Sequence, residues 1–387
     1  MRFSDLNDRT KKKAAPEKKY AAPFLPAGEP MIESSPAPWP DKASSERPIS
    51  RKDRQRRDEA SVRAAERPFR ELDAQARDVY ARNVSLAKEL LNQAGQPYIE
   101  KYERIVRMAD LNSQTLLENS VFLGYTNYAT ADNYLYAHSA NVAVISQAIG
   151  MAMGLEKSLV SFLGFCAMAH DIGMSDYAEM VSSAERLSDE DYSSVMSHSE
   201  AGAAKIDRLL DMDYRLKERA QKVILQVHER VDASGYPSSL MNEEIDILAQ
   251  IIGIADVYEA VSHPRPWRPA SHPHTAIKRL IDREEKGFDS KVIKAIIEVL
   301  SIYPPGSLVA LSTGEIASVI KVNKGSLTRP VVGVLLDGDF EPTPTRLVDL
   351  MEHPLTGIDR IVEENELIAR NPNFAARQEL SRWWVEW

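Results

Sequence analysis

The chain has 387 residues, a length that suggests about two or three structural units. Hydrophobic residues make up 43% and charged residues 27%, so most of the chain can build a buried core. The net charge of -9 is uneven, because residues 1–70 carry a surplus of six basic side chains and the rest a surplus of fifteen acidic ones. An acidic body argues against a nucleic acid polymer as the main partner, since phosphate contacts need a basic face.

The first residues show no secretory signal, because no apolar core follows the basic start Met1-Arg2. No window holds ~18 uninterrupted apolar residues, so we expect no membrane span. The single cysteine, Cys166, excludes an intramolecular disulfide and suits a reducing compartment. These features together predict a cytoplasmic protein.

Two segments precede the main domain. Residues 1–60 are rich in Pro, Ala, Ser, Lys and Arg without periodicity, which predicts a disordered basic tail. Residues 61–130 show apolar side chains at helical spacing, interrupted at Gly95-Gln96-Pro97, which predicts a two-helix unit. This unit suits an input module, an oligomerisation surface or a lid over the following core, and the pattern alone does not choose among them.

Residues 131–302 read as consecutive helices without a strand signal, so this domain is predicted to be all-α. After Pro304-Pro305-Gly306 the apolar period changes to two, which predicts a small β-module of about three strands over residues 303–355. Residues 356–387 are predicted to form a short helix and a tail. The fold class is therefore mainly α, with a helical core followed by a small β-module.

A neighbouring His170 and Asp171 close the apolar run Leu159–Ala169. Such a pair is costly to bury unless a metal ion or a hydrogen-bond network compensates it. Taken alone, the pair fits a metal-free hydrogen-bonded arrangement about as well as a metal site. The sequence supplies further side chains of the right type, and we interpret them with the pair as one cluster: His138, His198, His228 and Asp256.

Imidazole and carboxylate ligands suit iron, manganese, zinc or nickel. Asp171 has two oxygens and is able to bridge two ions. The ligands of one ion would then be completed by His138, His170 and Asp256, and those of the other ion by His198 and His228. Two ions ~3.5–4 Å apart would hold a bridging water, lower its pKa and clamp a phosphoryl group. The other histidines stand in Pro-rich or exposed-looking stretches and are predicted to lie on the surface: His263, His272, His274 and His353.

Two loops offer substrate contacts. Arg265 and Arg268 flank Trp267, so they would pin phosphates and stack a base, or else form a loop with solvated arginines. Gly235-Tyr236-Pro237 follows the helix that ends at His228, and its alternative interpretation is an ordinary turn with a packed tyrosine.

The chain resembles the HD-GYP family, the bacterial branch of HD-superfamily metal phosphohydrolases that hydrolyses cyclic di-GMP. The resemblance covers about residues 131–302, and the β-module resembles a common extension of the family. It rests on six motifs in the family's order: His138-Ser139, His170-Asp171-Ile172-Gly173, His198, His228-Glu229-Arg230 through Gly235-Tyr236-Pro237, Asp256-Val257-Tyr258-Glu259-Ala260 and Arg265-Pro266-Trp267-Arg268.

The resemblance implies an all-helical HD fold and a centre of two or three ions, usually iron or manganese. It implies that the six His and Asp side chains named above are the metal ligands, with His170 and Asp171 at the catalytic centre. Tyr236, Arg265 and Arg268 would contact a cyclic dinucleotide.

Five positions depart from the family pattern, of which Ser199, in place of a proline after His198, is expected to be harmless. Met174 stands where a lysine is usual, and Val227 stands where the first of two adjacent histidines is usual. Ala233 replaces a glycine, a mild change unless the position needs a positive φ. Tyr134 stands where three-metal members carry a glutamate. We therefore expect at most two ions, one of them weakly held.

Three functions follow from this pattern. The favoured one is metal-dependent hydrolysis of cyclic di-GMP, because most of the implied ligands are present. The alternative is a catalytically impaired domain that senses a cyclic dinucleotide or docks onto a signalling protein, which the departures at Met174 and Val227 would favour. The third is a metal-free scaffold.

Overall fold

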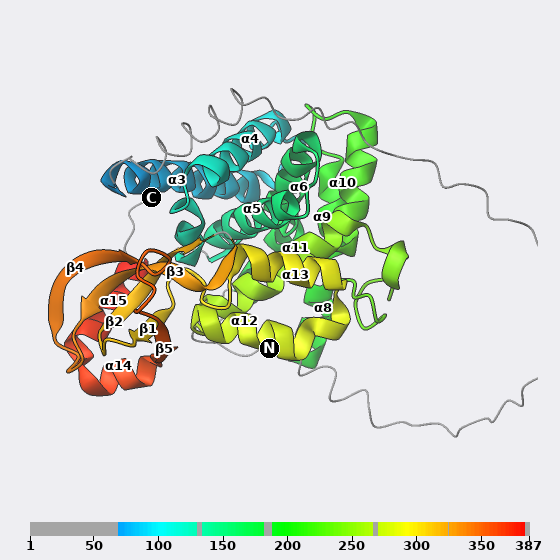
Figure 1. The fold of residues 1–387 in the computed structure, drawn as a ribbon. Helices are drawn as coiled ribbons and strands as arrows, with labels where there is room; N and C mark the ends of the chain where they lie inside the picture. Colours follow the sequence, from blue (N-terminus) through cyan, green and yellow to red (C-terminus); the bar gives the residue numbers. More distant parts are fainter. Residues whose placement is uncertain (1–68, 130–133, 182–187, 266–269, 324, 384–387) are drawn as a thin grey trace, which may run out of the picture. The chain divides into compact units, whose positions relative to one another are not determined.

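The computed structural model describes residues 69–129, 134–181, 188–265, 270–323 and 325–383. This part of the chain is mainly helical and ends in a small antiparallel sheet with two further helices, which confirms the predicted fold class (Figure 1). The predicted disordered tail, residues 1–60, lies outside the described residues.

The helical part begins with α3 (Phe69–Gln93), α4 (Tyr102–Glu118) and the short 3-10 helix η1 (Phe122–Asn127). The helices of the main domain follow in order: α5 (Tyr134–Ala152), α6 (Lys157–Ala169), η2 (Ile172–Tyr177), α7 (Ala178–Val181), α8 (Asp189–Met196), α9 (His198–Ile206), α10 (Tyr214–Gln226), η3 (Asn242–Glu244), α11 (Ile247–Ser262), α12 (Pro273–Glu284), η4 (Glu285–Gly287) and α13 (Ser290–Leu300).

Helix α5 is the centre of this domain and packs against α3, α4, α6, α11 and α13. Helices α5, α6 and α11 consist mostly of apolar residues without a distinct polar face, and all three are buried along most of their length. The segment Lys157–Tyr177 is long and apolar enough to cross a membrane, but 83% of its most apolar window is buried within the structure. Burial of this kind is what a core helix shows.

The N-terminal helices α3 and α4 share the core of the main domain. Leu90 of α3 and Ile105 of α4 lie in one buried cluster with Ile145 of α5 and Phe165 of α6. Polar side chains cross the same interface, since Asn112 of α4 exchanges buried hydrogen bonds with α3 and also donates to α5. The core is therefore continuous between the helices on either side of the predicted boundary at residues 130 and 131.

The β-module has five antiparallel strands, so the prediction of about three is wrong. They are β1 (Leu308–Leu311), β2 (Ile316–Asn323), β3 (Ser326–Leu336), β4 (Pro342–Asp349) and β5 (Ile358–Ile361), in the order β4-β3-β2-β1-β5. The two strands missed are the edge strands. Prolines 342 and 344 argue against a strand in general but are tolerated at an edge, and β5 is only four residues long. Helices α14 (Glu364–Arg370) and α15 (Pro372–Trp383) follow.

Candidate metal centre

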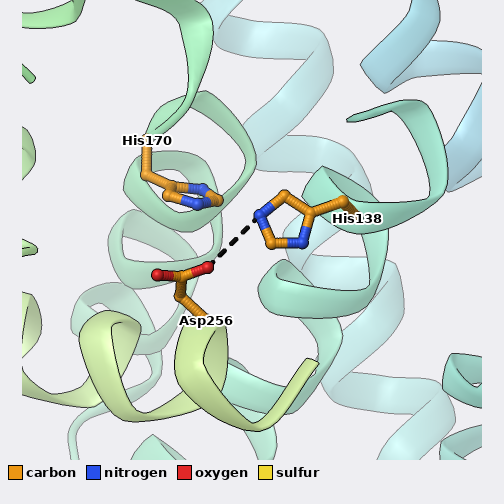
Figure 2. Close-up of side chains that lie close together, drawn as sticks. All are labelled: His138, His170 and Asp256. Atoms are coloured by element: carbon orange, nitrogen blue, oxygen red, sulfur yellow. Dashed lines mark ion pairs between the residues drawn. The ribbon is translucent and has the colours of Figure 1, made fainter. Parts of the chain in front are cut away.

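Six side chains from distant parts of the helical domain converge on one buried point. Each is between 1% and 7% exposed. They come from the N-terminal part of α5, the end of α6, the start of α9, the residues after α10, and α11: His138, His170, Asp171, His198, His228 and Asp256. Figure 2 shows three of them, with the His138 ring facing both the His170 ring and the Asp256 carboxylate.

The six fall into two groups of three. The first group is His138, His170 and Asp256, and the second is Asp171, His198 and His228; within each group one potential ligand atom per residue lies within 4.8 Å of the others. Each group offers two imidazoles and one carboxylate, which is the donor set that suits a divalent transition metal.

Asp171 lies between the groups. Its Oδ2 is 3.3 Å from Nε2 of His138, and its Oδ1 is 3.4 Å from Nε2 of His198 and 3.5 Å from Nε2 of His170. Oδ2 therefore faces the first group, and Oδ1 lies between His198 of the second group and His170 of the first, so the carboxylate reaches both groups as a bridging ligand must. Burial raises the pKa of Asp171, but His170, His138 and His198 outweigh burial and hold that pKa well below its usual range.

Backbone carbonyls orient two of the imidazoles. Nδ1–H of His170 donates to the Ala167 carbonyl at 2.7 Å, and Nδ1–H of His198 donates to the Val195 carbonyl at 2.7 Å. With the proton on Nδ1, each Nε2 keeps its lone pair toward the centre. Within the described part of the chain, Nε2 of His170 is buried and has no hydrogen-bond partner. A buried lone pair beside a carboxylate fits a bound cation.

Glu259 orients a third imidazole, that of His138 in the first group. Its Oε2 lies 2.5 Å from Nδ1 of His138, and the same oxygen accepts from Nη2 of Arg265 at 3.0 Å. The Glu259 side chain is 2% exposed. Burial raises its pKa, but His263, His138 and Arg265 outweigh burial and hold it well below the usual range. A carboxylate on the far nitrogen of a ligand histidine is the usual outer support of a metal site.

Sequence reasoning missed Glu259, although a signal was present. It stands three residues after Asp256 within an apolar helix, and this spacing places both carboxylates on one face of α11. A charge in such a helix needs a buried partner.

His228 completes the second group in a different way. Its Nε2 lies 2.9 Å from Nε2 of His198, and its Nδ1 lies 3.8 Å from Oδ2 of Asp256. The ring is stacked on Tyr236, with centroids 4.8 Å apart and planes 13° apart. Burial and the neighbouring His198 lower the pKa of His228 well below its usual value, which favours the neutral form that binds metal.

The predicted substrate contacts have partners within the protein. Tyr236 supports the His228 ring, and its backbone N–H donates to the His228 carbonyl at 3.2 Å. Arg265 is 8% exposed and lies over the Tyr134 ring, 4.3 Å from its centroid, while it donates to Glu259. Arg268 lies outside the described residues. A role for these side chains in binding substrate stays a prediction.

Two of the sequence departures belong to one apolar cluster next to the centre. Met174 is 8% exposed and lies in a buried cluster with Leu91, Leu135 and Val195, against which Tyr134 also packs. The place of the family's lysine is thus taken by a packed apolar side chain.

The other departures lie on the His228 side. Val227 is 1% exposed and packs in the main core. Ala233 has a φ of 61°, so this position does need the left-handed conformation that glycine adopts without cost. The replacement of glycine by Ala233 is therefore not a mild change, because the position does have a positive φ.

The prediction that four further histidines lie on the surface is wrong for His263 and His272, which are 4% and 7% exposed. His263 directly follows the last residue of α11, and Ser271, next to His272, donates its N–H to the Val261 carbonyl of that helix at 3.1 Å. His353 is exposed as predicted, and Nδ1 of the partly buried His274 lies 2.6 Å from the Ile302 carbonyl oxygen.

Comparisons with known proteins agree with this geometry. Residues 126–292 match the family described as "HD domain", and residues 308–370 match "KOW domain associated with HD domain". The chain is 31% identical over 255 residues to "Cyclic di-GMP phosphodiesterase PA4108" of Pseudomonas aeruginosa, an alignment that covers 65% of this chain and 60% of that protein. It is 26% identical over 243 residues to "Cyclic di-GMP phosphodiesterase PdeB" of Borreliella burgdorferi, covering 61% and 62%.

Among solved structures, the chain is similar to Bd1817, an HDG"Y"P protein from Bdellovibrio bacteriovorus. The TM-score is 0.47 with 19% sequence identity, covering 57% of this chain and 70% of that one. The chain spans about 60% of the length of the two phosphodiesterases it matches. It therefore carries an HD domain of the HD-GYP type, as the order of its motifs predicted.

Proposed function

We propose that the chain is a metal-dependent phosphodiesterase that hydrolyses cyclic di-GMP. The observation that carries this proposal is the pair of three-residue groups joined by Asp171, buried at the meeting point of α5, α6, α9 and α11. The two relatives above are named cyclic di-GMP phosphodiesterases, which supports the choice of substrate.

The donor set fits two divalent ions, with iron or manganese as our expectation. One ion would be held by His138, His170 and Asp256, and the other by His198 and His228, with Asp171 shared. When bound, such a pair of ions activates water and stabilises the charge that develops on a phosphodiester under attack.

The protein itself fixes the orientation of these ligands and buries them away from solvent. Ala167, Val195 and Glu259 accept the Nδ1 protons of three histidines, so each ring is fixed in one tautomer. Burial removes competing water, which strengthens the electrostatic interactions within the site. Tyr236 fixes the ring plane of His228. Arg268 and Arg265 are proposed to hold the phosphates, and a cytoplasmic location goes with this substrate.

A second function, a catalytically impaired cyclic-dinucleotide sensor or docking domain, is favoured by one specific observation. Met174 is packed among apolar side chains at the place of the family's lysine, so it brings no positive charge to a bound phosphate. Loss of one such electrostatic contact typically costs about 10²–10³ in rate.

Purification of the full chain without oxygen, followed by metal analysis and an assay with cyclic di-GMP, tests these functions. We expect up to two transition-metal ions per chain and hydrolysis that Asp171→Asn abolishes. Binding of cyclic di-GMP by metal-loaded protein without hydrolysis would favour the sensor. A chain that holds no transition metal after loading would contradict the phosphodiesterase and leave the metal-free scaffold.

A further inference from the structure

A chain of buried hydrogen bonds runs from helix α3 to the first group of the candidate centre. The Tyr80 hydroxyl of α3 donates to Oδ1 of Asn141 in α5 at 2.6 Å. Nδ2 of Asn141 donates to Oε1 of Glu259 in α11 at 3.1 Å, and the other oxygen of Glu259 faces Nδ1 of His138. Three side chains thus connect an N-terminal helix to a candidate ligand.

Every member of this chain is buried. Tyr80 and Asn141 have no exposed surface, and Glu259 and His138 are 1% and 2% exposed. In an interior of low dielectric, a buried donor or acceptor that loses its partner costs about 1–3 kcal/mol. Each side chain in the series therefore constrains the orientation of the next.

Asn141 transmits the constraint because its amide has an acceptor at one end and donors at the other. Nδ2 donates to both Glu259 and the Tyr128 carbonyl, and the Tyr80 hydroxyl on Oδ1 adds to the preference for this orientation of the amide. A flipped amide would turn Oδ1 toward the carboxylate, and two acceptors would then repel each other. Burial of Tyr80, followed by the charge of Glu259, raises the pKa of the phenol well above its usual value, so Tyr80 remains a donor.

We propose that Tyr80 is a positioning residue for the metal centre. Through Asn141 and Glu259 it fixes the hydrogen bond on Nδ1 of His138, and so sets the metal affinity of the group formed by His138, His170 and Asp256. The inference rests on the proposed metal binding. Direct outer partners of metal ligands are worth about 10–100-fold in affinity. Because Tyr80 acts through two intermediates, we expect its loss to weaken binding by about three- to tenfold.

Tyr125 offers a matched control. It lies in the same buried cluster as Tyr80, with ring centroids 5.9 Å apart. Its hydroxyl donates to Asp73 and has no part in the series that ends at His138. Tyr125→Phe therefore removes a phenol hydroxyl from the same cluster and leaves the connection to the centre intact.

The experiment uses the full chain, stripped of metal with a chelator and titrated with Mn²⁺ by calorimetry. We expect Tyr80→Phe to weaken the tighter Mn²⁺ site about three- to tenfold, whereas Tyr125→Phe binds as the parent does. Thermal unfolding of both variants measures the loss of stability separately. With Co²⁺ in place of Mn²⁺, the visible ligand-field bands should shift in Tyr80→Phe alone, which a purely structural role of Tyr80 would not produce.

Asn141→Ala interrupts the series at its middle and is expected to weaken Mn²⁺ binding more than Tyr80→Phe does, so it serves as the test if Tyr80→Phe folds poorly. Unchanged affinity in both variants, or equal weakening in Tyr125→Phe, would overturn the positioning role and leave the proposed metal centre in place. A parent chain that binds no Mn²⁺ or Co²⁺ would instead overturn the metal centre together with the inference.

Discussion

The two halves of the candidate centre are supported differently. The first half is His138, His170 and Asp256, and each of its imidazoles has an Nδ1 hydrogen bond, to Glu259 or to a backbone carbonyl. In the second half, Asp171, His198 and His228, the His228 ring is held by stacking and stands next to the departures at residues 227 and 233. Two of the departures from the family pattern thus lie beside the second half, which leads us to expect two ions of unequal affinity.

The largest effect should come from Asp171→Asn, because this residue of the second half also faces His138 and His170 of the first half. The amide has nearly the same shape but no charge, so neither ion gains the attraction of the carboxylate. We expect metal affinity to fall by at least about 100-fold at both sites and the hydrolysis of cyclic di-GMP to stop. Metal analysis after dialysis measures the change.

Asp359→Asn, on the exposed strand β5, provides the control for a lost carboxylate and should leave metal content unchanged. If Asp171→Asn emptied only one site, the view of Asp171 as the shared residue would be wrong.

The next effect distinguishes the halves directly. His228→Ala should remove the weak phase of a two-phase metal titration and keep the tight phase. His170→Ala should weaken the tight phase, since it removes a ligand whose tautomer is fixed by the Ala167 carbonyl. Calorimetric titration with Mn²⁺ reads both phases. If His228→Ala and His170→Ala both removed the same phase of the Mn²⁺ titration to the same extent, the two halves would not be separate metal sites.

His138 of the first half and His228 of the second half should also respond to pH with opposite sign in the metal-free protein. Burial lowers the pKa of His138, but Glu259 and the hydrogen bond to Asp171 outweigh burial and raise it to about 10. A raised pKa stabilises the folded chain below the unfolded value of about 6.5, and this stabilisation is lost as pH rises toward 10. The pKa of His228 is lowered, so its contribution is present above about 6.5 and is lost as pH falls.

The midpoint of thermal unfolding should therefore be highest near pH 6.5 and fall on both sides. His138→Leu should reduce the alkaline limb, to which His198 with its raised pKa also contributes, and His228→Leu should reduce the acid limb. Thermal scans of chelator-treated protein from pH 5 to pH 9 measure both limbs. His353→Leu, at an exposed position, is the control and should leave both limbs unchanged.

How far the sequence predicted the molecule differs between residue types. The order of the motifs was enough to choose the six side chains that the fold brings together, because apolar helices interrupted by His and Asp need buried partners. It was not enough to find Glu259 as the partner of His138, since that pairing depends on how α11 packs against α5. Arg265 was also not recognised as a partner of Tyr134, because the two residues lie in different segments and meet only in the folded chain. Strand β5 was missed for another reason, since it is too short to show an alternating pattern.

The smallest effect concerns the loop after His228. Ala233 has a φ of 61°, a conformation that costs a residue other than glycine roughly 1–2 kcal/mol. Ala233→Gly removes this strain but increases the freedom of the unfolded chain, which costs about 0.4–1 kcal/mol. The net expectation is a gain in unfolding free energy of up to about 1.5 kcal/mol, measured by urea titration. The strained residue is in the loop that carries Tyr236, so Ala233→Gly should also raise the affinity of the weaker metal site. We expect this gain to be less than about twofold, much smaller than the effect of a residue that contacts a metal ligand directly.

Ala204→Gly, at an exposed position within α9, is the control of opposite sign and should cost about 1 kcal/mol. A loss of stability in both variants would mean that Ala233 is not strained, and the asymmetry between the halves would then depend on Val227 alone. A gain at residue 233 with no gain in metal affinity would show that the backbone tolerates the family's departure. The weakness of the second half would in that case be a matter of its ligands and not of the loop that supports them.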